Sequence, residues 1–313
     1  MLRKYLTFLI LASFVLGSIA ACQGPTTVAS DSNAASEQNE RAYKKGKKAL
    51  DEKKFDEAKE LLFPAAENGN ANAQYELGNM FFNGVGVQTD HLMAAKWFQK
   101  AALQGRAGAQ AQLGSMYLIG LGVSIDHAKA AGWYQKAALQ GDTSAQTILG
   151  NMYLNGQWIP KDSAKAVAWY QKAAELGDAN AQTIVGNLYL TGQGLAQNLA
   201  KAEEWLQKSA AQGNASAMTK LGYMNFIGLG VPKDLAKAAK WYQKAASRGN
   251  AEAQTSLGNM LSTGQGMPKD LVSAAQWYQK AAMQGNVEAQ TNLISAKAEI
   301  ADAKKMKAPD PSQ

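Results

Sequence analysis

Few side chains in this 313-residue sequence have a type and spacing that could do chemistry, and the two histidines come first. His91 and His127 each follow an aspartate and lie 36 residues apart. If that separation is one structural repeat, two Asp–His pairs would lie side by side and could form a weak metal site. The equivalent positions further along the chain hold Leu235 and Leu271. We therefore interpret both histidines as variable, exposed residues at helix starts and expect no metal site.

The other residues that enzymes use do not form a catalytic pattern. The single cysteine excludes a thiol–metal site and an internal disulfide. The recurring Gly-x-Gly segments follow helical rather than strand patterns, so a phosphate-binding loop is not expected. We find no Ser–His arrangement and no carboxylate pair that a pocket would bring together. The sequence predicts a protein without catalytic residues and without a cofactor.

Cys22, the only cysteine, follows an export signal. A short basic stretch, Arg3 and Lys4, precedes an apolar run from Leu6 to Ile19 and two small residues, which is the order of a secretory signal peptide over 1–21. Ile19-Ala20-Ala21-Cys22 resembles the bacterial lipobox, which implies lipidation of Cys22 and a membrane contact through that lipid. Residue 23 is Gln rather than the aspartate that would favour inner-membrane retention. We therefore expect an outer-membrane lipoprotein that faces the periplasm.

The formal net charge is +7, but its distribution argues against nucleic acid as a partner. Lysines recur at one position every 36 residues: 100, 136, 172, 208, 244 and 280. One basic residue per unit is typical of a solvated helix face rather than of a nucleic-acid footprint.

A fixed period organises most of the chain. Tryptophans recur every 36 residues, and glycines recur with the same period at three further positions. Such a period indicates one supersecondary unit stacked on copies of itself. The tryptophans are Trp97, Trp133, Trp169, Trp205, Trp241 and Trp277. We expect them to fill the space between neighbouring units as part of the core.

Each unit has the pattern of a helical hairpin. In the first unit, Ala73, Leu77 and Met80 mark one face of a helix that ends near Gly84. Asp90 then occupies the N-cap of a second helix, which ends at Gly105. The sequence therefore predicts an all-α protein built from repeated helix-turn-helix units.

This pattern resembles the Sel1-like repeat, a relative of the tetratricopeptide repeat. Residues 145–177, for example, read AQTILGNMYLNGQWIPKDSAKAVAWYQKAAELG. The resemblance implies a right-handed α-solenoid. The predicted division is a signal peptide over 1–21, a lipidated cysteine and disordered tether over 22–39, a tetratricopeptide-like hairpin over 40–69, six repeats over 70–285, a capping helix over 286–304 and a disordered tail over 305–313.

By the same resemblance, one variable position of each first helix points into the concave groove of the superhelix. It holds Asn79, Asn151, Asn187, Tyr223 and Asn259. An asparagine carries an acceptor and two donors, which suit the backbone of an extended peptide. A solvated helix face would carry the same residues, and that alternative stays open. Aromatic residues that add candidate contact surface are Tyr75, Phe82, Phe226 and Trp158, the last of which replaces a turn glycine and could equally be a wedge into the neighbouring turn.

The leading hypothesis is a lipid-anchored, non-enzymatic scaffold that binds an envelope protein or peptide in its groove. A surface-exposed or secreted factor that binds host protein is the alternative, because some proteins with similar repeats have that role. A cell-wall hydrolase, the third hypothesis, has no support among the residues. The sequence does not indicate the oligomeric state.

Overall fold

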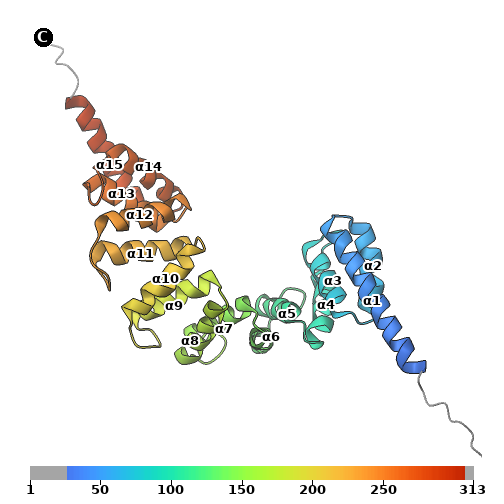
Figure 1. Cartoon of the computed structure of the whole chain (residues 1–313). Helices are drawn as coiled ribbons and strands as arrows, with labels where there is room; N and C mark the ends of the chain where they lie inside the picture. Colours follow the sequence, from blue (N-terminus) through green and yellow to red (C-terminus); the bar gives the residue numbers. More distant parts are fainter. Residues whose placement is uncertain (1–26, 307–313) are drawn as a thin grey trace, which may run out of the picture.

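The computed structural model describes residues 27–306, and these are all-helical. Figure 1 shows the helices as hairpins that follow one another along a curved, open array. Their bounds are α1 Thr27–Asp51, α2 Phe55–Glu67, α3 Ala71–Asn83, α4 His91–Leu103, α5 Ala107–Ile119, α6 His127–Leu139, α7 Thr143–Asn155, α8 Ser163–Glu175, α9 Ala179–Thr191, α10 Leu199–Ala211, α11 Ala215–Ile227, α12 Leu235–Ser247, α13 Ala251–Thr263, α14 Leu271–Met283 and α15 Val287–Met306. The predicted all-α fold of stacked helix-turn-helix units is confirmed.

Side-chain caps explain where most of these helices begin. Asp or Asn precedes each even-numbered helix from α4 to α14, and its carboxylate or amide oxygen accepts a hydrogen bond from the backbone N–H three residues on, at 2.8–3.0 Å. The odd-numbered helices from α3 to α13 end at a glycine in the left-handed conformation, with φ between 65 and 80°. These caps keep each hairpin at the same length along the array.

The centre of each hairpin is a large side chain packed on a glycine. Tyr170 of α8 is fully buried, and a Cβ added to Gly150 of α7 would lie 2.5 Å from its ring. The same pairing recurs in the other five units, where the large residue is Phe98, Tyr134, Leu206, Tyr242 or Tyr278. Because no side chain other than hydrogen fits at these glycines, the two helices of a hairpin can approach closely.

The tryptophans have a different place from the one predicted. Trp97 is 6% exposed, but the other five tryptophans of the series are only partly buried. They pack between neighbouring units, as expected, while the lysine three residues later lies over each ring at 4.1–4.8 Å from its centroid. The residue after each tryptophan is more buried than the tryptophan itself and is at most 4% exposed.

Neighbouring units are also joined by a glutamine clasp. Gln110 of α5 donates from its side-chain amide to the Ala102 carbonyl of the preceding unit at 3.0 Å, and accepts from Gln140 of its own unit at 2.8 Å. Gln74, Gln182 and Gln254 repeat both bonds. Gln146 keeps only the first bond, because Leu176 replaces the donor, and its Oε1 atom is buried without a partner.

The N-terminal hairpin begins earlier than predicted. Helix α1 starts at Thr27, so part of the expected disordered tether over 22–39 is helical. Residues 34–37 of this extension are exposed, which explains why its sequence lacks an apolar period. The packed part of α1 supplies the helical nucleus from which it extends. Lys47 connects the hairpin to the first repeat through an ion pair with Glu76 at 3.4 Å.

Candidate functional site

The polar position proposed for the groove lies on the odd-numbered helices, and we call the surface that they form the odd-helix face. At this position, three of the six side chains form hydrogen bonds inside the molecule. The Tyr170 hydroxyl donates to Asn151 Oδ1 at 2.8 Å, and the Tyr278 hydroxyl donates to Asn259 Oδ1 at 2.7 Å. Ser115 and Tyr134 form the same contact at 2.8 Å. In these three units the polar side chain of the odd-numbered helix holds the hydroxyl of the buried tyrosine in place.

Asn259 is engaged most completely. Its Oδ1 atom also accepts from Asn292 at 2.9 Å, and its amide donates to Glu288 Oε1 at 3.0 Å. Both partners belong to α15, the last helix of the array. Asn259 therefore joins the final repeat to the capping helix, and the prediction that it contacts a partner is the weakest of the asparagine series.

Two asparagines of the same series lack a tyrosine partner. The large buried residue of the hairpin is Phe98 in the unit of Asn79 and Leu206 in the unit of Asn187, and neither carries a hydroxyl. Within the described part of the chain, neither amide side chain forms a hydrogen bond. Tyr223 occupies the position in the next unit and is 47% exposed. The polar groups that remain available to a partner are therefore at Asn79, Asn187 and Tyr223.

The odd-helix face is hollowed near its N-terminal end. A depression of about 200 Å³ crosses α3, α5 and α7, and Tyr75, Ala111, Ser115 and Ile148 contribute to its wall. Gly108 also lines it, and a Cβ there would crowd the Tyr75 ring at 3.2 Å. A surface that crosses three successive units in this way suits an extended segment rather than a small molecule.

The aromatic candidates are more buried than the sequence suggested. The Tyr75 ring lies 5.8 Å from that of Phe98, and the Arg106 guanidinium covers it at 4.8 Å. Phe82 packs 6.3 Å from the same Phe98 ring. Phe226 packs against the buried cluster around α11 and α12. Each of these side chains is partly buried, so it would offer a partner a ring edge at the rim of the core, and its role in binding stays a prediction.

Trp158 keeps both of its proposed roles. Its ring stacks on His127 of the preceding unit, with centroids 4.9 Å apart and an angle of 30° between the ring planes. This contact fits a wedge between neighbouring units. It is nevertheless 42% exposed. Its backbone has a φ of 73°, the left-handed conformation that the equivalent glycines adopt in the other units. A non-glycine residue in this region is strained by about 1–3 kcal/mol.

The two histidines are partly buried against different aromatic rings, rather than exposed as expected. His91 packs against Phe82 with ring centroids 5.3 Å apart, while His127 packs against Trp158. Among residues 27–306, no group of three or more His, Cys, Asp or Glu side chains could hold a metal ion. None of the helices described is long and apolar enough to span a bilayer. Cys22, the signal peptide over 1–21 and the tail residues 307–313 lie outside the described part of the chain.

The buried tyrosines make the array sensitive to alkali. Burial raises the pKa of Tyr170 and of Tyr242 to about 12, from an ordinary value of 10.0. Because the neutral phenol is favoured in the folded state, this stabilisation is complete below pH 10 and is lost as the pH rises toward 12. Each residue contributes roughly 2–3 kcal/mol. We expect cooperative loss of helical circular dichroism in that window.

Tyr170→Phe is the matched control for this alkaline transition. It removes one titrating group, so the transition should move to higher pH. Helicity that persists through the titration of the tyrosines, followed by their ultraviolet absorbance, would contradict the assignment of these rings to the core.

Sequence reasoning missed the tyrosine–asparagine bonds and the glutamine clasp. A signal for the first existed: each large residue follows its glycine by 20 positions and the polar residue by 19. Only a pairing of the two helices shows that these positions touch.

Comparisons with known proteins agree with this architecture. The model of the Sel1 repeat family matches residues 71–105, 107–142, 143–178, 179–214, 215–250 and 251–286. The crystal structure of c5321, a protective antigen of uropathogenic Escherichia coli strains, is 40% identical with a TM-score of 0.72, and the match covers 75% of this chain and 50% of that one. A Sel1 repeat protein from Oxalobacter formigenes is 33% identical with a TM-score of 0.71, covering 77% and 99%. This chain thus spans half the length of the c5321 chain. No curated protein matches it.

Proposed function

This chain belongs to the Sel1 repeat family, and from that membership we propose that it is a scaffold of the bacterial cell envelope that holds a protein or peptide partner on its odd-helix face. The family is generally non-catalytic, and its repeats suggest protein partners. The observation that carries the proposal is the row of polar side chains on the odd-helix face. Among them, the side chains of Asn79, Asn187 and Tyr223 form no hydrogen bond with any described residue.

The scarcity of charged residues on the odd-helix face supports recognition through neutral polar groups. The six odd-numbered helices from α3 to α13 carry only Glu76, Lys220 and Glu252 as charged residues. Glu76 is buried and already paired with Lys47. A neutral surface that presents amide and hydroxyl groups suits the backbone of an extended segment, whose N–H and C=O groups need partners of both kinds.

Anchoring to the outer membrane through Cys22 is part of the proposal and rests on the lipobox resemblance alone. Because Cys22 precedes all of the repeats, a lipid on it would leave the whole array free to face the periplasm. A second orientation, exposed at the cell surface or secreted, is favoured by one observation: the c5321 protein is described as a protective antigen. Protease treatment of intact cells separates the two, because only a surface-exposed array would be cleaved.

The binding face is tested with a double substitution in adjacent units. Asn187→Ala with Tyr223→Ala should weaken binding of a partner recovered by crosslinking from the native envelope. The expected loss is about tenfold or more, because two polar contacts of roughly 1–3 kcal/mol disappear. Thermal stability should change little, because the described part of the chain offers neither side chain a hydrogen-bond partner. Isothermal titration with the purified partner gives the affinity.

The matched control is Lys136→Ala with Lys172→Ala on the even-numbered helices. Binding that is lost in the lysine variant and kept in the Asn187 and Tyr223 variant would place the partner on the opposite face and refute the proposal. Asn151→Ala is not a clean test, because Tyr170 would lose its acceptor and the fold itself would weaken.

A further inference from the structure

Gly132 is the one glycine of the repeats for which neither the turns nor the packing gives a reason. It lies in the middle of α6, and a Cβ added there would have no atom within 4 Å. The equivalent positions in the other units hold Lys96, Ala168, Glu204, Lys240 and Gln276. A glycine in a helix interior costs about 1 kcal/mol relative to alanine. The side chain is therefore absent at a cost that the fold does not require.

The space beside Gly132 is a cleft of about 430 Å³ between α6 and the turn that connects α7 to α8. Its lining is mainly apolar and includes Ala131, Leu149, Tyr153, Ile159 and Pro160. A long side chain at position 132 would extend into this space. The cleft is thus open because position 132 is glycine.

Trp158, one of two non-glycine residues with a positive φ in the described part of the chain, directly precedes Ile159 and Pro160 of the cleft lining. Trp158 occupies the turn position at which Gly122 and Gly266 come so close to the preceding unit that a Cβ would lie 2.1 and 2.4 Å from a backbone oxygen. Trp158 has a Cβ at this position, and its ring stacks on His127 of α6. Gly132 lines the cleft, and the strained Trp158 directly precedes two of its lining residues.

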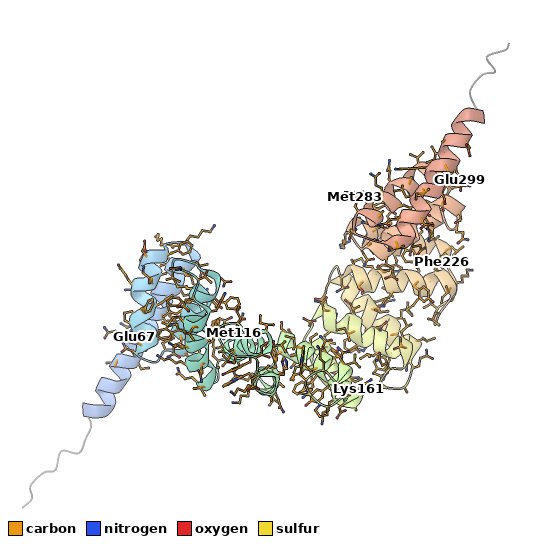
Figure 2. The ribbon with its side chains drawn as sticks, turned by 180° about the vertical axis from the view of Figure 1, so that it is seen from behind. Glu67, Met116, Lys161, Phe226, Met283 and Glu299 are labelled. Carbon is orange, nitrogen blue, oxygen red and sulfur yellow. The ribbon has the colours of Figure 1, made fainter. Side chains whose placement is uncertain are left out.

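Charge defines what this cleft would accept. The even-numbered helices from α4 to α14 carry twelve lysines and three glutamates, in contrast to the nearly uncharged odd-helix face. Among the lining residues, Asp162 is already paired with Lys165 at 3.1 Å. Lys161 lines the cleft and forms no ion pair with any described residue. Figure 2 labels it at the outer edge of the arc. Lys161 therefore gives the lining a net positive charge beside an apolar floor.

We propose that this cleft is a second docking site, which takes an apolar side chain of a partner protein flanked by acidic residues. The apolar floor removes the anchoring side chain from water, and the unpaired Lys161 pairs with a carboxylate beside it, in the field of the lysine-rich even-numbered helices. The cleft lies on a different surface from the odd-helix face. The scaffold would therefore hold two segments at once, one recognised by neutral polar contacts and one by charge and an apolar anchor.

The test uses the full chain and a fluorescein-labelled peptide, Glu-Asp-Glu-Phe-Glu-Asp-Glu, followed by fluorescence anisotropy. Two comparison peptides replace the phenylalanine by alanine or the acidic residues by glutamine and serine. The parent peptide should bind, and each comparison peptide should bind at least about tenfold more weakly. Affinity for the parent peptide should fall with added salt, because the pair formed with Lys161 is exposed.

Gly132→Gln is the decisive variant. It fills the cleft with a side chain that α14 already tolerates at the equivalent position, and it should raise helix stability while peptide binding falls about tenfold or more. Ala168→Gln, the matched substitution one unit later, should leave binding unchanged. Equal binding by wild type and Gly132→Gln would overturn the proposal, as would equal binding of the alanine peptide. Association with phosphatidylglycerol vesicles without peptide binding would assign the basic face to lipid headgroups and also overturn it.

Discussion

Tyr170→Ala should destabilise the array by about 3–5 kcal/mol, more than Trp169→Ala in the same helix. The Tyr170 ring is fully buried, rests on Gly150 and donates its hydroxyl to Asn151 at 2.8 Å. Its removal leaves a cavity inside the hairpin. Trp169 is only partly buried and its outer face lies under Lys172, so its truncation removes less buried surface. Denaturant titration of both variants gives the two losses in stability.

The loss should also be local. Each unit of a repeat array contacts its neighbours, so hydrogen exchange should accelerate first in α7 and α8 and spread outward. Tyr170→Phe is the control, because it keeps the ring and should cost only about 1 kcal/mol for the lost hydrogen bond. A larger loss for Trp169→Ala than for Tyr170→Ala would restore the tryptophan series as the core and invalidate the burial order described above.

Cys22→Ala should convert the protein from a membrane-associated to an unprocessed or soluble form. Without the thiol no acyl chain can be attached, and each buried methylene contributes about 0.8 kcal/mol of membrane affinity, so several chains account for the whole of the anchoring. Metabolic labelling with a radioactive or alkyne fatty acid, followed by membrane fractionation, measures both effects.

Cys22→Ser provides the closest control, since it differs from cysteine in one atom and should behave as the alanine variant does. Persistent fatty-acid labelling and unchanged membrane partition in both variants would rule out Cys22 as the lipidated residue. The array itself should melt at the same temperature in all three proteins, because Cys22 precedes the described helices.

The repeat could be predicted from the sequence because its period is unbroken and its caps are local. An aspartate before a helix and a glycine after it act within a few residues, so Asp90 and Gly84 mark boundaries without knowledge of the fold. The same local reasoning gave a start that was too late for α1. Its first turns lack an apolar face, and only the packed turns that follow hold them in a helix.

The binding face was less accessible to such reasoning because it depends on pairs of helices. Asn151 and Asn187 occupy the same position and look equivalent in the sequence. They differ because one faces Tyr170, which has a hydroxyl, and the other faces Leu206, which has none. The cleft beside Gly132 likewise depends on the turn around Trp158, a residue 26 positions away. Periodicity identifies positions, while their chemistry depends on what lies across the interface.

The glutamine clasp has a consequence for how the array would respond to its surroundings. Gln110, Gln182 and their equivalents join successive units through uncharged amides. Neither ionic strength nor moderate acidification alters an amide, so cohesion is separate from the lysine-rich outer surface. At the envelope location that we propose, the protein would meet large changes in salt and acidity. In such a medium the distance between lysines of successive units would stay constant, because the amide bonds that set it are neutral. The attraction of these lysines for acidic molecules would instead weaken as the salt concentration rises.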